Sequence, residues 1–356
     1  MPWTDKCNFP FPKNWDEWEK EIPKPIFELY GAPEVTDITV TEYGPTKGVE
    51  VQPKWDLPEK IVIKVAITGA FFSKRQNPNH PITTQEILES AREALKAWAP
   101  AVHIHVRDPK TGMPTHKIEL YREILVPLRK EFPDRILDAC CVFGPTHHET
   151  LMPVEEGLID ITPVNTTAVY CGDSLLAPNP KFLMAKTHYL QEMGCKPEIA
   201  VYDTGDIDNA YRWLIKTGIL EKPYYWIVLP ALPGGSPASW GPIAMAESLT
   251  FMVKRIKEID PESVIMVCCA GRAARFLGVQ ALLLGCHVRV GMEDTIYKWP
   301  HSDERITSNA EEFLAMKAIA ENLGYKIATA EDYAKMIGLD KLRERKKKMI
   351  GKYPAP

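Results

Sequence analysis

Two histidines spaced two residues apart are the feature of this chain that most directly suggests chemistry. His103 and His105 lie in the apolar run AVHIHV (101–106), and alternate side chains of a β-strand point to the same face. Two imidazoles on one face at the end of a strand can bind one divalent metal ion. The alternative is a pair of histidines held by hydrogen bonds without any metal.

A carboxylate late in the chain completes a set of metal ligands. Glu293 stands in RVGMED, directly after the last of eight apolar runs. In a closed barrel the second and eighth strands both neighbour the first, so about 10 Å separates them at roughly 4.8 Å per strand. Two histidines, one carboxylate and an open position are typical of catalytic zinc. Ligand type also admits Mn²⁺, Co²⁺ or Fe²⁺.

Two charged neighbours of Glu293 are candidates for acting on a substrate. Asp294 follows it directly and is a candidate general base, or alternatively a helix N-cap. Arg289 shares the side of Glu293 along the strand. A guanidinium there can hold a substrate carboxylate through two hydrogen bonds, or alternatively form a buried structural ion pair.

Further candidates follow other apolar runs. Cys140, at the end of RILDACC (135–141), is a candidate catalytic thiol, with pocket lining as the alternative. Gly271 and Arg272 precede a helical stretch. Because helix amides and a guanidinium coincide there, we expect this position to bind an anionic group of the substrate.

Eight apolar runs, each followed by a stretch of helical periodicity, must position these side chains. The runs lie at 61–68, 101–106, 135–141, 158–164, 198–202, 224–230, 263–269 and 286–291. Apolar strands that alternate with helices are typical of a parallel sheet covered on both faces. Eight such units predict an α/β fold, the closed (β/α)8 barrel, whose functional residues lie at the C-terminal ends of the strands. The rival doubly wound sheet requires G-x-G-x-x-G after its first strand, which TGAFFSKRQNP lacks.

Two segments flank the predicted catalytic barrel of residues 61–325. Residues 326–356 are expected to form a helical C-terminal extension. Residues 1–60 are rich in Pro and Trp, and we expect an arm that packs on the barrel or on a neighbouring subunit. Its aromatic side chains would supply the buried area: Trp3, Phe9, Phe11, Trp15, Trp18, Phe27 and Tyr30.

Composition excludes several classes of protein. The 356 residues are 45% hydrophobic and carry 43 Lys+Arg against 47 Asp+Glu, which excludes a disordered chain and gives no overall attraction to nucleic acid. No stretch approaches the roughly 18 apolar residues of a membrane span, and the N-terminus lacks the apolar region of a secretory signal. Eight cysteines without Cys-x-x-Cys do not predict a disulfide framework. We therefore expect a cytoplasmic protein that binds neither nucleic acid nor membrane.

Taken together, several motifs resemble the β-keto acid cleavage enzyme family. They are ITGA (67–70), Asn79-x-Pro81-Ile82-Thr83, VHIHVRD (102–108), GCHVRVGMED (285–294), Ser308-Asn309-Ala310 and IATAEDYAKMIGL (327–339). The resemblance covers roughly residues 61–340 and leaves the N-terminal segment out.

The resemblance implies a TIM barrel with zinc on His103, His105 and Glu293, a substrate-carboxylate role for Arg289 and a base role for Asp294. It also implies acetyl-CoA as co-substrate. A β-keto acid and acetyl-CoA would give acetoacetate and a new CoA thioester by Claisen condensation and retro-Claisen cleavage. Members of the family are commonly tetrameric, so we expect a homo-oligomer.

The resemblance implies a hydroxyl at two positions, and the chain changes one of them. Cys140 stands where the founding enzyme of the family has a small hydroxyl residue, and a thiol hydrogen-bonds only weakly. Thr162 supplies the hydroxyl of the fourth strand. The alternative alignment places Asn165 and Thr166 there, which makes Thr166 a candidate substrate contact.

Two further differences concern the substrate. Phe71 stands where the founding enzyme places an acidic residue for a substrate amine, and Ala200 stands in place of a second acidic residue. An ammonium group would lose hydration there without a charged partner. We therefore expect a β-keto acid without an amino group, with Phe71 as a substrate contact.

Two other functions stay open at this point. One is a different metal-dependent hydrolase or aldolase on the same barrel. The other is a metal-binding barrel that has lost its chemistry through the change at Cys140. CoA-dependent release of acetoacetate would distinguish the family reaction from the first of these functions. Bound metal without turnover would favour the second.

Overall fold

The structure, a computed structural model, describes residues 12–22, 39–40, 47–142, 144–171, 174–231 and 241–349. The chain divides into two compact units, residues 1–56 and 57–356. In the first unit, α1 (Trp15–Glu21) begins at Asn14, whose side chain accepts a hydrogen bond from the Glu17 amide. The other five aromatic residues named above lie outside the described residues. The packing role expected of this segment stays a prediction.

Eight parallel strands of the second unit close into a barrel. In chain order they are β2 (Ile63–Ala66), β3 (Ala101–Ile104), β6 (Ile136–Ala139), β7 (Ile161–Asn165), β10 (Lys196–Val201), β11 (Tyr225–Val228), β12 (Val264–Cys268) and β13 (His287–Val290). Each strand pairs with the next, and β13 pairs with β2. Every strand overlaps one of the eight apolar runs, so the predicted (β/α)8 barrel is confirmed.

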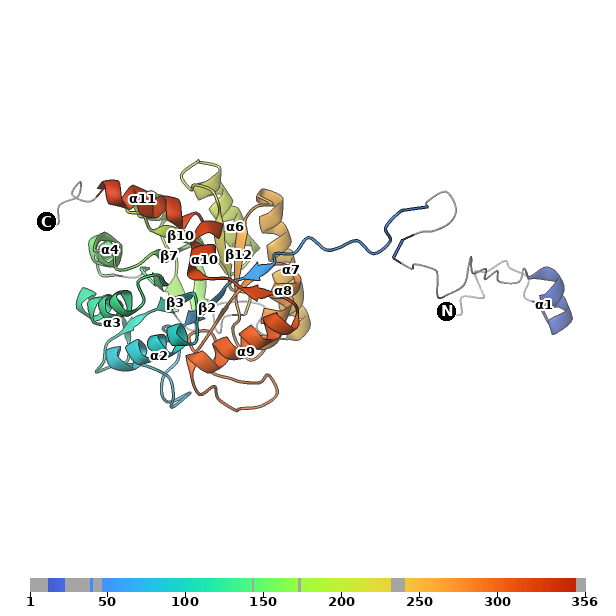
Figure 1. Cartoon of the computed structure of the whole chain (residues 1–356), viewed down its shortest axis with the longest axis horizontal. Coiled ribbons are helices and arrows are strands. Elements are labelled where there is room, and N and C mark those ends of the chain that lie inside the picture. Colours follow the sequence, from blue (N-terminus) through green and yellow to red (C-terminus); the bar gives the residue numbers. More distant parts are fainter. Residues whose placement is uncertain are drawn as a thin grey trace. The chain divides into compact units, whose positions relative to one another are not determined.

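Helices surround these strands, as Figure 1 shows. They are α2 (Thr84–Lys96), α3 (Ile118–Glu131), α4 (His147–Glu155), α5 (Pro180–Glu192), α6 (Thr204–Ala210) with a π-helical turn at Tyr211–Ile215, α7 (Pro242–Ile259), α8 (Ala274–Leu283) and α9 (Asn309–Asn322). The first of them begins at a capping box in which Thr83 and Glu86 bond each other's backbone amides. Helix α2 then buries Ile87, Leu88 and Leu95, because apolar residues at helical spacing share one face.

The C-terminal segment closes the end of the barrel at which the strands begin. Strand β1 (Lys60–Ile61) pairs with β14 (Lys326–Ile327), and α10 (Ala330–Met336) and α11 (Leu339–Met349) follow. Tyr333 of α10 is buried in the same apolar cluster as the first residues of several strands. Its hydroxyl lies 2.5 Å from that of Tyr225 at the start of β11. The opposite end of the barrel is therefore left for a functional site.

None of the described helices is long and apolar enough to cross a membrane.

Candidate active site

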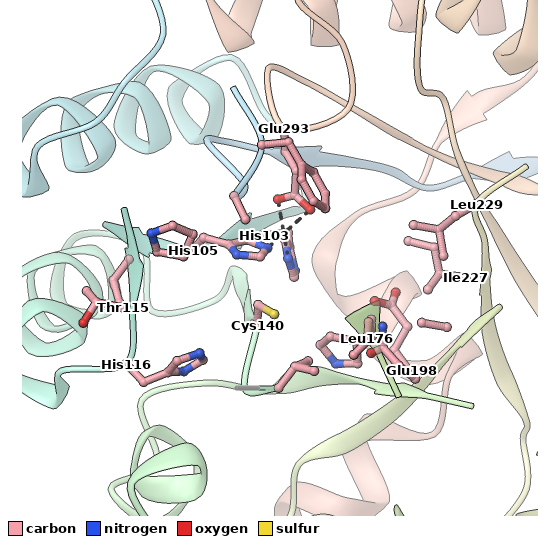
Figure 2. A pocket seen from close by; sticks show the side chains of 18 of the residues that line it. His103, His105, Thr115, His116, Cys140, Leu176, Glu198, Ile227, Leu229 and Glu293 are labelled. Atoms are coloured by element: carbon pink, nitrogen blue, oxygen red, sulfur yellow. Dashed lines mark ion pairs between the residues drawn. The ribbon is translucent and has the colours of Figure 1, made fainter. Parts of the chain in front are cut away.

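His103, His105 and Glu293 meet at the C-terminal ends of β3 and β13. One potential ligand atom from each lies within 4.8 Å of the other two. Glu293 Oε2 lies 3.5 Å from His103 Nε2, and Oε1 lies 3.5 Å from His105 Nε2, as the dashed lines in Figure 2 mark. These distances exceed those of normal charge-assisted hydrogen bonds. They match the roughly 3.4 Å expected between neighbouring ligands of a tetrahedral zinc ion with bonds of about 2.1 Å.

A glycine allows this position of Glu293. Gly69, in the loop after β2, has φ +60°, and a Cβ atom built on it would lie 2.4 Å from Glu293 Cγ. Arg107 fixes the loop by donating to the carbonyls of Gly69 (2.7 Å), Phe72 (2.9 Å) and Gly112 (2.6 Å). The glycine of ITGA is therefore required both by its backbone conformation and by the metal-ligand candidate packed against it.

Buried charges lie behind His103. Its Nδ1 is 2.9 Å from Asp138 Oδ2, and Lys64 Nζ is 2.6 Å from the same oxygen. Lys64 Nζ also lies 2.5 Å from Glu198 Oε1. All four side chains are at most 2% exposed. The candidate site residues named above do not include Lys64, Asp138 or Glu198, although a charged residue inside an apolar barrel strand is a signal that can reveal such a network.

Arg289 and Asp294 form a buried ion pair on the other side of the cluster. Arg289 Nη2 lies 2.5 Å from Asp294 Oδ1 and its Nε lies 3.1 Å from Oδ2, so the pair is bidentate. The same guanidinium lies 3.2 Å from Glu293 Oε1. Burial raises the pKa of Asp294 to about 6, although the charge of Arg289 opposes that shift. The ion pair named above as an alternative for Arg289 is thus present, and Arg289 also lines the pocket.

The charges buried around the three candidate ligands favour a divalent cation. Six ion-paired side chains, all at most 8% exposed, carry a net charge of −2 when the histidines are neutral: Lys64, Arg289, Asp138, Glu198, Glu293 and Asp294. The buried guanidinium of Arg107 near Glu293 reduces this to −1. Uncompensated buried charge is strongly unfavourable. Although burial disfavours a charged imidazole, the nearby Cys140 and Glu293 raise the pKa of His105 to about 10. The donor set and the surrounding charge therefore fit a divalent metal ion.

The cluster forms one wall of a pocket of about 430 Å³, a size suited to a small-molecule ligand. Two short hairpins contribute to its rim: β4 (Val106–Arg107) with β5 (Pro114–Thr115), and β8 (Val169–Cys171) with β9 (Ser174–Leu176). Figure 2 shows Ile227 and Leu229 across the pocket from His105 and Thr115. Apolar side chains away from the cluster line much of the rest: Phe71, Met113, Val142, Leu175, Leu176, Ile227 and Leu229.

The structure brings only some of the remaining predicted residues to the pocket. Phe71 and Cys140 line it. Thr162 does not: its hydroxyl donates to the Ala139 carbonyl (2.7 Å) and accepts from the Cys141 amide (3.1 Å). Because side chains alternate along a strand, Pro163 and Asn165, and not Thr162, face the pocket from β7.

Three more predicted substrate contacts lie outside the pocket wall. The Thr166 hydroxyl donates to the Asp206 carbonyl (2.8 Å). The Gly271 amide donates to the Asp294 carbonyl (3.0 Å), which places the start of α8 beside the site. The Arg272 guanidinium lies 2.5 Å from Asp303. The substrate roles of Thr166, Gly271 and Arg272 stay predictions.

His116 is a pocket residue that the sequence motifs did not reveal. It lines the pocket together with Tyr121, and Figure 2 shows its ring on the same side of the pocket as Thr115. Burial, together with the charges of His105 and Lys186, lowers the pKa of His116 to about 4. The imidazole is therefore neutral near pH 7. A lone histidine after a short hairpin carries no sequence signal that marks it as a pocket residue.

Comparisons with known proteins identify the family and the fold. A 3-keto-5-aminohexanoate cleavage enzyme of Fusobacterium nucleatum is 33% identical over 287 residues, which is 80% of this chain and 99% of that protein. A 3-dehydrocarnitine:acetyl-CoA trimethylamine transferase of Rhizobium meliloti is 27% identical, over 79% of this chain and 97% of that protein. The apo structure of ObcA superposes with a TM-score of 0.62 at 20% identity, over 73% of this chain and 66% of that chain, and shares the fold. The profile of the family described as beta-keto acid cleavage enzyme matches residues 60–339, and the chain belongs to that family.

Proposed function

We propose that this protein is a metal-dependent transferase that converts a β-keto acid and acetyl-CoA into acetoacetate and a new acyl-CoA. The observation that carries the proposal is the convergence of His103, His105 and Glu293 at the pocket of a barrel of this family. The name of the Rhizobium meliloti relative, an acetyl-CoA-dependent transferase, supports acetyl-CoA as the co-substrate.

His103, His105 and Glu293 are the residues that would hold the metal. We propose Zn²⁺, because two imidazoles and one carboxylate suit it, although Mn²⁺, Co²⁺ and Fe²⁺ accept the same ligands. When bound, the ion supplies a Lewis acid that polarises a carbonyl group.

The other residues of the site bind the substrate and move its protons. Arg289 lines the pocket, and the part of its guanidinium that is not bonded to Asp294 is the proposed contact for the substrate carboxylate. Asp294 is held by that same guanidinium and is fully buried behind the residues that line the pocket; it is the proposed acceptor of the proton from the carbon between the carboxylate and the keto group. Cys140 lines the pocket beside them as a weak hydrogen-bonding group. Gly271 and Arg272 at the start of α8 are the proposed contact for the anionic part of acetyl-CoA.

In the overall reaction one carbon–carbon bond forms and another breaks, and one thioester bond breaks and another forms. The deprotonated keto acid attacks the acetyl carbonyl, so that a carbon–carbon bond forms and CoA leaves as a thiolate. The thiolate then adds to the original keto carbonyl. The bond between that carbon and the carbon that was deprotonated then breaks. Acetoacetate is released and takes up the proton that Asp294 accepted, and the new acyl-CoA remains.

The proposed substrate has a neutral, largely apolar tail. Phe71 and Ala200 both line the pocket. Of the described residues that line it, the carboxylates are Glu293, which we assign to the metal, and Glu198, which is already paired with Lys64. An ammonium group on the tail would therefore be buried without an unpaired carboxylate.

A product screen tests this function. The metal-loaded protein is incubated with acetyl-CoA and a panel of β-keto acids that differ only in the tail, and acetoacetate and acyl-CoA are measured by mass spectrometry. We expect both products in equal amounts, with neutral tails turned over faster than the aminated one. No product from any member of the panel would contradict the proposed function. Preference for the aminated acid would contradict only the proposed tail.

We also propose a homo-oligomer, with a tetramer as the expected state. Exposed apolar side chains on α7 and α8 support an interface there: Ile243, Phe251, Phe276 and Leu283. Light scattering of the purified protein measures the assembly directly, and a monomer at micromolar concentration would contradict the proposal.

A further inference from the structure

We infer that Asp138 is a positioning residue for His103 and that Lys64 in turn fixes Asp138. The inference rests on the proposed metal site. It concerns groups that do not touch the substrate or the metal but determine how one ligand presents its nitrogen.

The first link is the contact between Asp138 and His103. His103 Nε2 faces Glu293, so its other nitrogen, Nδ1, is the one left for a partner within the protein. Asp138 Oδ2 lies 2.9 Å from Nδ1. A histidine that binds metal through Nε2 carries its proton on Nδ1, and a carboxylate acceptor there fixes the tautomer and the ring orientation. The carboxylate also makes the imidazole a stronger ligand.

The second link is the barrel backbone. His103 on β3 and Asp138 on β6 are partners in the strand register. Paired residues of neighbouring strands project to the same face, so the sheet itself places the carboxylate beside the imidazole. The contact therefore depends on rigid elements, not on a loop.

The third link is Lys64. Its Nζ lies 2.6 Å from the Asp138 oxygen that faces His103, and 2.5 Å from Glu198 Oε1. Lys64 and Asp138 are fully buried. A single buried carboxylate would be strongly disfavoured, and the lysine compensates it at the same oxygen that faces the imidazole. Glu198 shares the lysine charge, so that one cation serves two carboxylates.

A purely structural ion pair would have different consequences. Replacing a buried ion pair by neutral residues is often tolerated or even stabilising, and such a change alters the melting temperature without altering metal affinity. A positioning role instead predicts a change in the affinity for the metal and in the geometry of the bound ion.

Full-length Asp138→Ala and Asp138→Asn, stripped of metal with a chelator, test the inference. The Zn²⁺ dissociation constant is measured by competition with a chromophoric chelator, and the visible spectrum of the Co²⁺-loaded protein reports ligand geometry. We expect Asp138→Ala to raise the dissociation constant about 10- to 100-fold and to shift the Co²⁺ bands. Asp138→Asn should have a smaller effect, because its amide oxygen can take the place of the carboxylate oxygen that faces Nδ1.

A matched control separates positioning from stability. Arg275 and Glu312 form another largely buried ion pair at 2.7 Å, and neither residue lines the pocket. Glu312→Gln should lower the melting temperature and leave the Zn²⁺ dissociation constant and the Co²⁺ spectrum unchanged.

Lys64 is tested as a pair with Glu198. Lys64→Met alone would leave two buried carboxylates without a cation, so Lys64→Met is combined with Glu198→Gln. We expect a weaker affinity for Zn²⁺, and less than additive loss when Asp138→Ala is added, because the lysine acts through Asp138.

The outcomes for Asp138 and for the metal site are distinguishable. If Asp138→Ala binds Zn²⁺ as tightly as wild type with the same Co²⁺ spectrum, the positioning role is wrong and the proposed function stands. If wild type itself binds no divalent metal, the proposed metal-dependent function fails, and the positioning role fails with it.

Discussion

Arg289 holds Asp294 by two hydrogen bonds, of 2.5 Å and 3.1 Å, in a fully buried position next to Glu293. One guanidinium thus contacts both the candidate base and a candidate metal ligand, to which it lies 3.2 Å away. Adjacent carboxylates repel each other, and the charge of the arginine favours the ionised form of both, although burial still raises the pKa of Asp294 to about 6. Neutralising Asp294 should nevertheless abolish turnover, whereas neutralising Glu293 should abolish metal binding.

Asp294→Asn should retain the metal and lose turnover. The amide keeps the shape of the side chain but cannot accept a proton, and general base catalysis typically contributes about 10²- to 10⁴-fold. The measurement is kcat for acyl-CoA formation alongside the metal content of the same sample. An active Asp294→Asn would show that another group is the base.

Gly69→Ala should weaken metal binding through Glu293. The added Cβ would lie 2.4 Å from Glu293 Cγ, so the carboxylate must move. Gly218→Ala is the matched control, since Gly218 has a similar φ of +74° but nothing within 4 Å of its Cβ position. Each variant should lose about 1–3 kcal/mol of unfolding free energy from left-handed backbone. Only Gly69→Ala should raise the Zn²⁺ dissociation constant; equal affinity in both variants would contradict the packing argument.

Phe71→Glu should shift substrate preference toward an aminated β-keto acid. Phe71 lines the pocket and is 40% exposed at its rim, so a carboxylate can be introduced there without burial of an unpaired charge. We expect the ratio of kcat/KM for the aminated over the neutral acid to rise about tenfold, which corresponds to roughly 1.4 kcal/mol. Phe71→Gln controls for the loss of the ring, and an equal shift with glutamine would refute the charge explanation.

The fold could be predicted in detail because its signals are local. Eight apolar runs separated by helical periodicity admit few architectures, and Thr83 with Glu86 marks the start of α2 from four residues alone. The sequence did not indicate that α10 closes the end of the barrel at which the strands begin, because the contact between Tyr225 and Tyr333 joins residues 108 positions apart.

The site was predictable only in part. His103, His105 and Glu293 come together as the strand order requires. Thr162 faces away from the pocket, since the sequence does not fix which residues of a buried strand point inward when both faces are apolar. Asn165 faces the pocket instead.

Stability should fall between about pH 6.5 and pH 4 because of His287. Burial, with the charge of Lys257, lowers its pKa to about 4, and its Nδ1 accepts a hydrogen bond from the Val62 amide at 3.2 Å. The unfolded chain protonates this residue near pH 6.5 and the folded chain does not, so the unfolded state binds more protons as the pH falls through this window. His287 should therefore contribute a loss of about 2 kcal/mol between roughly pH 7.5 and pH 5.

Urea unfolding of wild type and His287→Gln at both pH values measures this contribution. The glutamine oxygen can accept the Val62 hydrogen bond but does not titrate, so the variant should lose less stability on acidification. The other buried histidines are common to both proteins. An identical loss in wild type and variant would contradict the assignment to His287.

The metal content of wild-type protein and of Glu293→Gln, purified in parallel and analysed by elemental mass spectrometry, tests the central claim most directly. We predict about one divalent ion per wild-type chain, as for a single tetrahedral site, and little or none in Glu293→Gln with the fold intact by circular dichroism. A wild-type protein without metal, or a variant that retains the full amount, would contradict it.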